Sequence, residues 1–348
     1  MKRVEAKKRA PAGRRKRKIP APRKLFLGVD VGGTKVAAGL VDSSGEIVFC
    51  TRVPMIARGT AAEGVAAVLS AIDRVRAARP DVRLDSVGIT SPGPLDPNAG
   101  IVLNPPNVPC WRDFPLAREV ERVSGLPARL DNDANAAGLA EAFWGAGRGF
   151  RNVFYVTIGT GIGTGIIFDR RIFHGRSGAA GEGGHMTIDL RGPLCACGKR
   201  GCIEALAAGP AIAARARERI AAAGARGARM LTLAGGAADS ISAEVVAEAW
   251  REGDALAREI FEETWDLLAI WLGNIVDLLE PDAIIFGGGV GQLAGHGFDR
   301  IREALPRWSV NPRCAEIPLL LARYGADAGI PGAAALCFAR LNPPVAAE

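Results

Sequence analysis

The sequence has no long apolar run of the kind that crosses a membrane. Its most apolar stretch, residues 154–168, is interrupted by four glycines and three threonines, whereas a bilayer-spanning helix needs about 20 mostly apolar residues. The pattern of a secretory signal is also missing, because the apolar segment after the basic N-terminal residues is short and meets Asp30 at once. We therefore expect a protein with no membrane span.

Cysteine is scarce and odd in number. The chain has seven Cys, and small disulfide-bonded secreted domains carry a much higher density. Three of the seven lie within residues 195–202, and the other four are scattered. Reduced thiols fit this usage better than a disulfide framework does, so we expect a cytoplasmic protein.

A net positive charge is missing from most of the chain, although the formal net charge of the whole is +7. Residues 1–24 contain twelve Lys or Arg and one Glu, whereas the rest contains 32 basic and 36 acidic residues. A segment so basic, mixed with Pro and Ala, buries little apolar area and is expected to be a disordered tail. The tail can touch nucleic acid, anionic lipid or an acidic partner without specificity, but specific nucleic-acid binding is not expected.

Two common phosphate-binding patterns, the Walker P-loop and the GxGxxG fingerprint, are absent. Residues 25–48 instead read as a strand, a glycine turn and further strand. In the turn, Gly33 lets backbone N–H groups approach a ligand, Thr34 offers a hydroxyl and Lys35 a charge. Asp30, just before the turn, offers a carboxylate for magnesium or an ordered water. The segment predicts a phosphate cradle, and a plain glycine hairpin is its alternative.

A second turn of glycine and threonine repeats this design. Residues 152–175 read as strand, turn and strand, and the turn holds Thr160 and Gly161. Two similar cradles suggest two related lobes that close on one polyphosphate, and 348 residues with 48% hydrophobic content are enough for two cores. A later buried strand opens onto Gly288 and Gly289, whose bare backbone suits an adenine ring or its ribose.

Three polar residues lie where a strand meets an alanine-rich helix. Asp131, Asn132 and Asp133 therefore occupy a helix N-terminus. The positive end of the helix favours an ionised carboxylate at that position. Helix capping is the alternative interpretation, but capping needs only one of the three residues. The cluster therefore points to a functional site as well as to a cap.

A proline-rich segment, residues 91–116, follows a buried strand that we expect at residues 82–90. Its many Pro, Gly and Asn residues indicate a rigid loop, which is suited to forming one wall of a pocket. Asn107 within this segment offers a polar side chain to the hydroxyl groups of a ligand.

Metal ligands are most concentrated in residues 181–204, GEGGHMTIDLRGPLCACGKRGCIE. Three thiols and one imidazole make a complete tetrahedral zinc set: His185, Cys195, Cys197 and Cys202. A closed set of four protein ligands is typical of a structural rather than a catalytic metal. The alternative is that three reduced thiols are neighbours by coincidence. On ligand spacing we expect zinc to staple this loop, with Glu182 and Glu204 at its ends.

Six motifs, in their order and spacing, resemble the ROK family of sugar kinases and sugar-responsive repressors. They are VDVGGTK (29–35), DNDANAAGLAE (131–141), TIGTGIGTG (157–165), GEGGHM (181–186), CACGKRGCIE (195–204) and FGGGV (286–290). The resemblance covers about residues 25–341. It implies the actin-like, ribonuclease-H-type ATPase fold, an α/β fold of two lobes with a sugar and ATP bound between them.

The resemblance also implies a division into lobes and a set of site residues. Residues 25–135 with about 330–348 would form a smaller α/β lobe, and residues 136–329 a larger α/β lobe with the zinc-stapled loop. Asp133 would be the general base that accepts the proton of the primary (6-) hydroxyl of a hexose, with ATP and Mg²⁺ as the donor. The implied sugar-binding residues are Asn107, Asn132, Glu182, His185 and Glu204. The implied phosphate and nucleoside residues are Asp30, Gly33, Thr34, Lys35, Thr160, Gly161, Gly288 and Gly289.

Glucose is the substrate that the resemblance favours. Residues 88–111 look like the corresponding segment of ROK glucokinases, and Pro94 stands where mammalian-type N-acetylmannosamine kinases carry an arginine. The alternatives are N-acetylmannosamine, N-acetylglucosamine or fructose as substrate, and polyphosphate as donor. From another class, the alternative is a ROK transcriptional regulator, but residues 1–24 lack the apolar pattern of a winged helix-turn-helix. The family also implies a homodimer.

Overall fold

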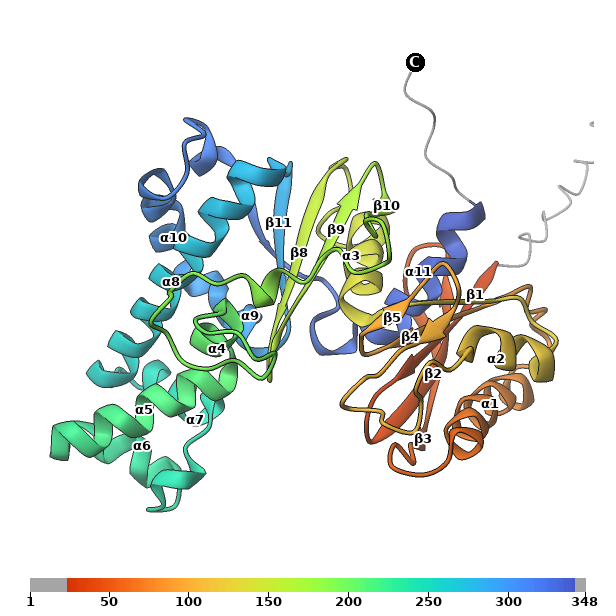
Figure 1. Cartoon of the computed structure of the whole chain (residues 1–348), viewed down its shortest axis with the longest axis horizontal. Helices are drawn as coiled ribbons and strands as arrows, with labels where there is room; N and C mark the ends of the chain where they lie inside the picture. The colour runs from red at the N-terminus through yellow and green to blue at the C-terminus, as the bar shows by residue number, and fades with distance from the viewer. Residues whose placement is uncertain (1–23, 342–348) are drawn as a thin grey trace, which may run out of the picture.

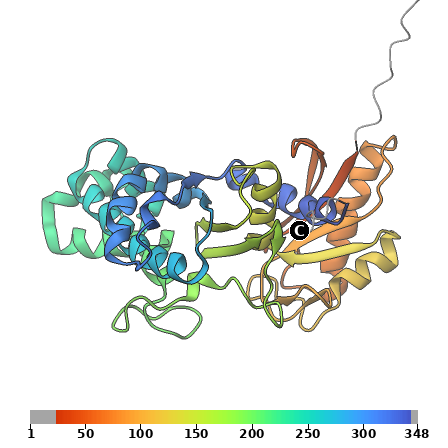
Figure 2. The ribbon, with the colours of Figure 1, turned by 90° about the horizontal axis from the view of Figure 1, so that it is seen from above.

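The computed structural model describes residues 24–341, and the tail predicted at residues 1–24 lies outside this range apart from Lys24. The predicted α/β class is confirmed, since two five-stranded sheets alternate with helices along the chain. Figures 1 and 2 show an elongated molecule with the first sheet toward one end, the second sheet near the middle, and helices such as α5 and α7 at the other end. Within residues 24–341, no helix is long and apolar enough to span a bilayer.

The first sheet has the order β3-β2-β1-β4-β7. Strands β1, β2 and β3 are antiparallel neighbours, whereas β4 and β7 run parallel to β1. Its strands are β1 (Leu25–Val31), β2 (Lys35–Asp42), β3 (Ile47–Pro54), β4 (Val87–Ser91) and β7 (Ala128–Asn132). Apolar side chains from this sheet form one core with α1 (Ala61–Ala78) and α2 (Leu116–Ser124). A short hairpin of β5 (Leu95–Asp96) and β6 (Ile101–Val102) lies in the proline-rich segment.

The second sheet repeats this arrangement with the order β10-β9-β8-β11-β12. Again three antiparallel strands are followed by two parallel ones. The strands are β8 (Val153–Ile158), β9 (Ile162–Phe168), β10 (Arg171–Ile172), β11 (Ala283–Gly287) and β12 (Leu319–Leu321). The same order in both sheets agrees with the repeated strand–turn–strand pattern of the sequence.

Helices cover the second sheet and build its core. The longest, α8 (Ala255–Leu279), begins at Asp254, whose side chain accepts a hydrogen bond from the backbone N–H of Ala257. Its apolar positions every three or four residues pack against the sheet and the neighbouring helices. The other helices of this part are α4 (Ile203–Ala207), α5 (Gly209–Ala223), α6 (Ala228–Leu233), α7 (Ala243–Arg251), α9 (Gly289–Leu293) and α10 (Phe298–Ala304).

Two helices made largely of small residues lie between the sheets (Figure 1). They are α3 (Asp133–Trp144) and α11 (Gly329–Leu341), and they share a third core with side chains from both sheets, such as Phe26 and Tyr155. Helix α11 approaches β4 so closely that a Cβ at Gly88 would lie 1.8 Å from the carbonyl oxygen of Ala333. Glycine at this position is what allows the contact.

One sequence-based expectation about the strands is wrong in part. A buried strand was expected over residues 82–90, but β4 begins only at Val87. Arg83 and Asp85 are exposed and form a surface ion pair 3.4 Å apart. Alternating charged residues therefore keep this stretch at the surface until the apolar run begins.

Candidate active site

A pocket of about 200 Å³ lies where the proline-rich segment, the start of α3, strand β9 and residues 177–182 meet. It brings together three of the predicted site residues, Asn132, Asp133 and Glu182. The other lining residues are Gly93, Pro94, Leu95, Leu103, Asn135, Gly163, Thr164, Ser177, Gly178, Ala179, Ala180 and Gly181. We call this the sugar pocket below, after the ligand that the sequence predicts for it. Its size and its convergent polar groups suit a small polar ligand.

Asn132 serves as both cap and pocket residue. Its Oδ1 accepts hydrogen bonds from the backbone N–H groups of Ala134 at 2.9 Å and Asn135 at 3.3 Å, so it caps α3. Its Nδ2 lies on the side of Gly93, another residue of the pocket lining. Both interpretations of the polar cluster therefore apply to Asn132. Its Oδ1 serves as the helix cap, and its Nδ2 is the atom available at the pocket.

Asp133 is the first residue of α3 and is exposed to the sugar pocket. Because its carboxylate lies in a cleft among many protein atoms, desolvation raises its pKa to about 6, and the negative charge of Asp30 adds to the effect. The hydrogen bond from the backbone N–H of Ala134 to Oδ1, 2.8 Å long, acts in the opposite direction. The helix N-terminus was expected to dominate, but desolvation outweighs it. A pKa near neutrality suits a general base.

The first predicted phosphate cradle is the turn between β1 and β2. Asp30 accepts a hydrogen bond from the hydroxyl of Thr90 at 2.9 Å, and burial raises its pKa despite this bond and the nearby Lys35. The turn closes by a 2.9 Å bond from the N–H of Gly32 to the carbonyl of Lys35. Thr34 and Lys35 are exposed at its tip and are accessible to a ligand.

Asn107 lies beside this cradle and outside the sugar-pocket lining. A Cβ at Gly33 would be 2.8 Å from the backbone carbonyl of Asn107. Since Gly33 and Asn107 are in contact, the proline-rich segment borders the phosphate turn as well as the sugar pocket. The structure thus separates Asn107 from Asn132 and Glu182, which line the sugar pocket.

The second cradle, the turn between β8 and β9, is held by Glu204. The Oε2 atom of Glu204 accepts a hydrogen bond from the N–H of Ile162 at 2.9 Å and would be 2.6 Å from a Cβ at Gly161. On the other side, the carbonyl of Gly159 accepts a 2.8 Å bond from the N–H of Gly209. Glu204, predicted as a sugar ligand, therefore positions the turn that carries Thr160.

The glycines predicted to lie against a nucleoside follow β11. Gly288 has φ +77°, and a Cβ there would be 2.4 Å from the carbonyl of Ile158, so a side chain is excluded. Gly289 faces open space, since nothing lies within 4 Å of a Cβ built on it. The end of β11 thus presents bare backbone next to the end of β8.

The four predicted zinc ligands come together in one cluster, and their ligand atoms all lie within 4.8 Å of one another: His185, Cys195, Cys197 and Cys202. The Nδ1 of His185 is 3.6 Å from the Sγ of Cys195, and the two other sulfurs are 3.7 Å apart. Ligands about 2.3 Å from a tetrahedral zinc ion are about 3.8 Å apart, so the donor set and its spacing fit zinc. Burial raises the pKa of Cys195, while the backbone N–H of Lys199 lowers that of Cys197.

This cluster is joined to the second cradle through Glu204. One carboxylate oxygen, Oε2, holds Ile162 of the turn, and the other, Oε1, lies 3.8 Å from the Nδ1 of His185 and 3.7 Å from the Sγ of Cys195. His185 therefore belongs to the metal-ligand cluster and Glu204 lies beside it, and neither residue lines the sugar pocket.

Two polar residues of the site, Asn135 and His174, were not predicted from the sequence. Asn135 is buried and lines the sugar pocket, and its Oδ1 has no hydrogen-bond partner among the residues that the structure describes. Behind it, Asp131 accepts hydrogen bonds from the Nδ2 of Asn135 at 3.1 Å and from the N–H of Asn132 at 2.8 Å, and pairs with His174 at 2.7 Å. Asn135 could have been predicted because it is the second Asn of the DNDAN motif. No motif near His174 in the sequence points to its role.

A model described as the ROK family matches residues 26–340. The chain belongs to the ROK family. The family predicted from the six motifs is therefore confirmed. Among ROK proteins, a glucokinase of Streptomyces coelicolor is 36% identical over 90% of this chain and 97% of its own length. An N-acetylmannosamine kinase of Salmonella typhi is 32% identical over 89% of this chain and 97% of its own length.

Solved structures of ROK proteins are also similar to the chain. A ROK family glucokinase from Streptomyces griseus, in complex with glucose and AMPPNP, superposes with a TM-score of 0.76 at 38% identity, over 90% of this chain and 98% of that one. A ROK family transcriptional regulator, a homologue of the E. coli MLC protein, superposes with a TM-score of 0.79 at 29% identity, over 90% of this chain and 78% of that one. Both enzymes and regulators thus share this fold.

Proposed function

We propose that this ROK protein is an ATP-dependent hexose kinase that transfers the γ-phosphoryl group to the 6-hydroxyl, with glucose as its preferred substrate. The relative of 36% identity is a glucokinase, and the S. griseus glucokinase binds glucose and AMPPNP. The observation that carries the proposal is the position of Asp133, which opens onto a small polar pocket close to Asp30 at the edge of the first phosphate cradle. The carboxylate of Asp133 thus lies between the proposed sugar pocket and the proposed phosphate cradle.

Asp133 acts as the general base in this proposal. Its carboxylate accepts the proton of the primary hydroxyl while that oxygen attacks the γ-phosphoryl group, and with a pKa of about 6 it is largely ionised at neutral pH. Asn132 through Nδ2, Glu182 through its carboxylate and Asn135 through the unpartnered Oδ1 hold the other sugar hydroxyls. Phosphoryl transfer depends mainly on such positioning and on electrostatic stabilisation.

The two cradles and the glycines after β11 hold the nucleotide. Asp30, Gly33, Thr34 and Lys35 lie at one side of the phosphates, Thr160 and Gly161 at the other, and Gly288 and Gly289 against the nucleoside. When bound with ATP, Mg²⁺ would neutralise phosphate charge, and Asp30 is the carboxylate placed to hold it or its water. Lys35 contributes a point charge from the exposed tip of its turn.

We infer the two-lobed, actin-like arrangement from the repeated strand order of the two sheets. Residues 25–135 with about 330–348 form the smaller lobe, and residues 136–329 the larger one. The sugar pocket supports this division, because its lining comes from both ranges. Closure of the lobes on ATP would bring the two cradles to the same phosphates.

Zinc at the cluster of His185 and the three cysteines would be structural, since four protein ligands fill its coordination. We propose that it fixes Glu204 and, through it, the turn of Thr160. The family resemblance also implies a sugar contact by His185, and its Nε2 remains available for that contact because Nδ1 faces Cys195. In this proposal His185 is both a metal ligand and a sugar contact. The main role of Glu204 is to hold the turn that carries Thr160.

A second candidate substrate is an acetamido sugar. The S. typhi relative of 32% identity is an N-acetylmannosamine kinase. Pro94 lines the sugar pocket of this chain, follows Gly93 through a cis peptide bond, and leaves the wall without an arginine. Fructose and N-acetylglucosamine are tested in the same panel of sugars, and polyphosphate is tested as donor in place of ATP by measuring the phosphorylated sugar. A homodimer is the family expectation for the assembly.

The experiment that tests the function follows ADP release with ATP and Mg²⁺ and a panel of glucose, mannose, fructose, N-acetylmannosamine and N-acetylglucosamine. We expect the highest kcat/KM with glucose. A preference for an acetamido sugar would replace the substrate assignment. Tight, sequence-specific DNA binding without sugar-dependent turnover of ATP would replace the kinase by a regulator.

A further inference from the structure

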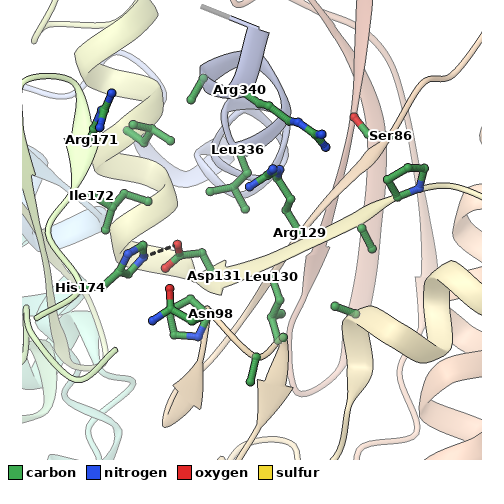
Figure 3. Close-up of a pocket in the computed structure, with 18 of the residues that line it drawn as sticks. Ser86, Asn98, Arg129, Leu130, Asp131, Arg171, Ile172, His174, Leu336 and Arg340 are labelled. Atoms are coloured by element: carbon green, nitrogen blue, oxygen red, sulfur yellow. Dashed lines mark hydrogen bonds and ion pairs between the residues drawn. The ribbon is translucent and has the colours of Figure 1, made fainter. Parts of the chain in front are cut away.

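A second pocket, of about 670 Å³, lies on the other side of the DND segment from the sugar pocket, and the two share no lining residue. It is bounded by the edge strand β7 of the first sheet, the edge strand β10 of the second, and the C-terminal half of α11 (Figure 3). Five of its lining residues are arginines, which are Arg118, Arg129, Arg170, Arg171 and Arg340. We call it the arginine pocket. None of the predicted sugar, phosphate or nucleoside residues lines it.

The positive charge of the arginine pocket is mostly uncompensated. Within residues 24–341, four of its arginines form no ion pair, namely Arg118, Arg129, Arg171 and Arg340. Arg170 lies over the ring of Phe143 at 6.0 Å. The two acidic residues of the lining have other partners, since Glu121 accepts from the N–H of Ala128 and Asp131 pairs with His174. A bound anion would supply the missing negative charge.

Two of these arginines act on the same spot. Figure 3 shows the guanidinium groups of Arg129, from β7, and Arg340, from α11, on the same side of the pocket, with Arg340 extending toward Ser86. Both lower the pKa of the buried Cys337 thiol, and so does the Ser86 hydroxyl, although burial raises this pKa overall. The two guanidinium groups therefore act on the same part of the pocket. Guanidinium forks match the oxygens of a phosphate group by paired hydrogen bonds.

The volume of the pocket indicates the size of its ligand. Small-molecule sites occupy roughly 300–1,000 Å³, and the arginine pocket falls within this range at about 670 Å³. Apolar side chains such as Leu336 and Ile172 line part of the wall and can cover the carbon skeleton of a small ester. These features favour a small molecule that carries a phosphate group on a short organic part.

One carboxylate connects the two pockets. Asp131 lines the arginine pocket, where its Oδ2 pairs with His174 at 2.7 Å. Its Oδ1 accepts from the N–H of Asn132 and from the Nδ2 of Asn135, both of which line the sugar pocket. A shift of His174 or of β7 on ligand binding is therefore transmitted to the residues on either side of Asp133.

We propose that the arginine pocket binds a soluble phosphate monoester and that the bound anion modulates hexose phosphorylation through Asp131. The binding step stands independently of the proposed kinase function, whereas the modulation rests on it. A phosphate monoester carries about two negative charges at neutral pH, which match Arg129 and Arg340. Binding would reduce the repulsion among the arginines and draw β7, β10 and α11 together.

The binding test uses glycerol 2-phosphate as the probe. It is titrated calorimetrically into protein that is saturated with glucose and AMPPNP, so that the catalytic cleft is occupied. Since hydrogen bonds to charged groups contribute strongly, we expect Arg129→Gln with Arg340→Gln to weaken binding by about tenfold or more. The charge-matched control, Arg258→Gln with Arg307→Gln, removes two exposed arginines outside the pocket and should leave affinity unchanged. Glycerate, which has a carboxylate only, should bind more weakly.

Three outcomes would overturn the site: no binding at millimolar concentrations, equal weakening in both double variants, or unchanged binding in Arg129→Gln with Arg340→Gln when its thermal unfolding is normal. The modulation is tested by the KM for glucose and by kcat with and without glycerol 2-phosphate. We expect a change in the wild type that disappears in His174→Gln while probe binding persists. Binding of the probe with no change in either constant would refute the modulation and leave the binding site in place.

Discussion

Replacement of Asp133 by Asn tests the core of the proposed mechanism. The amide keeps the size of the side chain and an oxygen that can accept from the N–H of Ala134, so α3 should begin as before. It cannot accept the proton of the sugar hydroxyl, and general-base catalysis is worth about 10²–10⁴ in rate. We therefore expect kcat to fall by about this factor, with sugar binding preserved when measured by calorimetry.

The pH dependence of the wild type follows from the same carboxylate. Its pKa in the folded protein is about 6, so the ionised, proton-accepting form is lost below that pH. We expect kcat/KM to fall about tenfold per pH unit under pH 6 and to be level above it. The residual kcat/KM of Asp133→Asn should not show this fall below pH 6. If the fall persists in the variant, another group is responsible for the titration.

The stability of the variant gives an independent test. The pKa of Asp133 is raised from 3.8 to about 6 on folding, so between these values the folded state binds more protons than the unfolded state. Its contribution to stability therefore falls as pH rises through this window and stays unfavourable at pH 7. Asp133→Asn should raise the Tm at pH 7, and the gain should shrink toward pH 4. Asp73→Asn, which changes an exposed carboxylate, is the control. A variant that keeps activity and loses stability would refute the reasoning.

Three further variants probe the supports of the site. Glu204→Ala removes the acceptor of the Ile162 N–H and should raise the KM for ATP by about tenfold, because hydrogen bonds to charged groups are worth about 1.5–3 kcal/mol; an unchanged KM would separate Glu204 from the phosphate turn. Cys195→Ala should lower the zinc content, the Tm and the sugar affinity together, whereas the exposed Cys50→Ala should change none of them; lower stability with unchanged sugar affinity would contradict the link. Gly88→Ala should destabilise the fold by about 1–3 kcal/mol or more in denaturant unfolding, because its Cβ would overlap the carbonyl of Ala333. The control Gly291→Ala meets nothing closer than 3.6 Å and should cost much less.

Local pattern in the sequence was enough for the elements and the metal cluster. Apolar runs broken by glycine turns predict β1–β2 and β8–β9, and the short spacing of Cys195, Cys197 and Cys202 restricts how far apart their sulfurs can lie. The helix start at Asn132 was also predictable, since capping depends on residues that are neighbours in the chain. The conformation of residues 82–86, before β4, was not predictable, because alternating charged and apolar residues do not reveal whether tertiary packing covers them.

Tertiary structure determined the environment and the long-range partners of the individual site residues. The sequence alone determined the family, the two similar turns and a set of four potential metal ligands, because each depends on residue types at short spacing. Only the fold determined that Asp133 is desolvated despite its place at a helix N-terminus, since the desolvating atoms come from distant segments. Only the fold showed that Glu204 holds the turn between β8 and β9, 42 residues away along the chain, and joined His174 to Asp131 across 43 residues. Electrostatic environment and long-range hydrogen bonds depend on packing in three dimensions, and no local spacing specifies them.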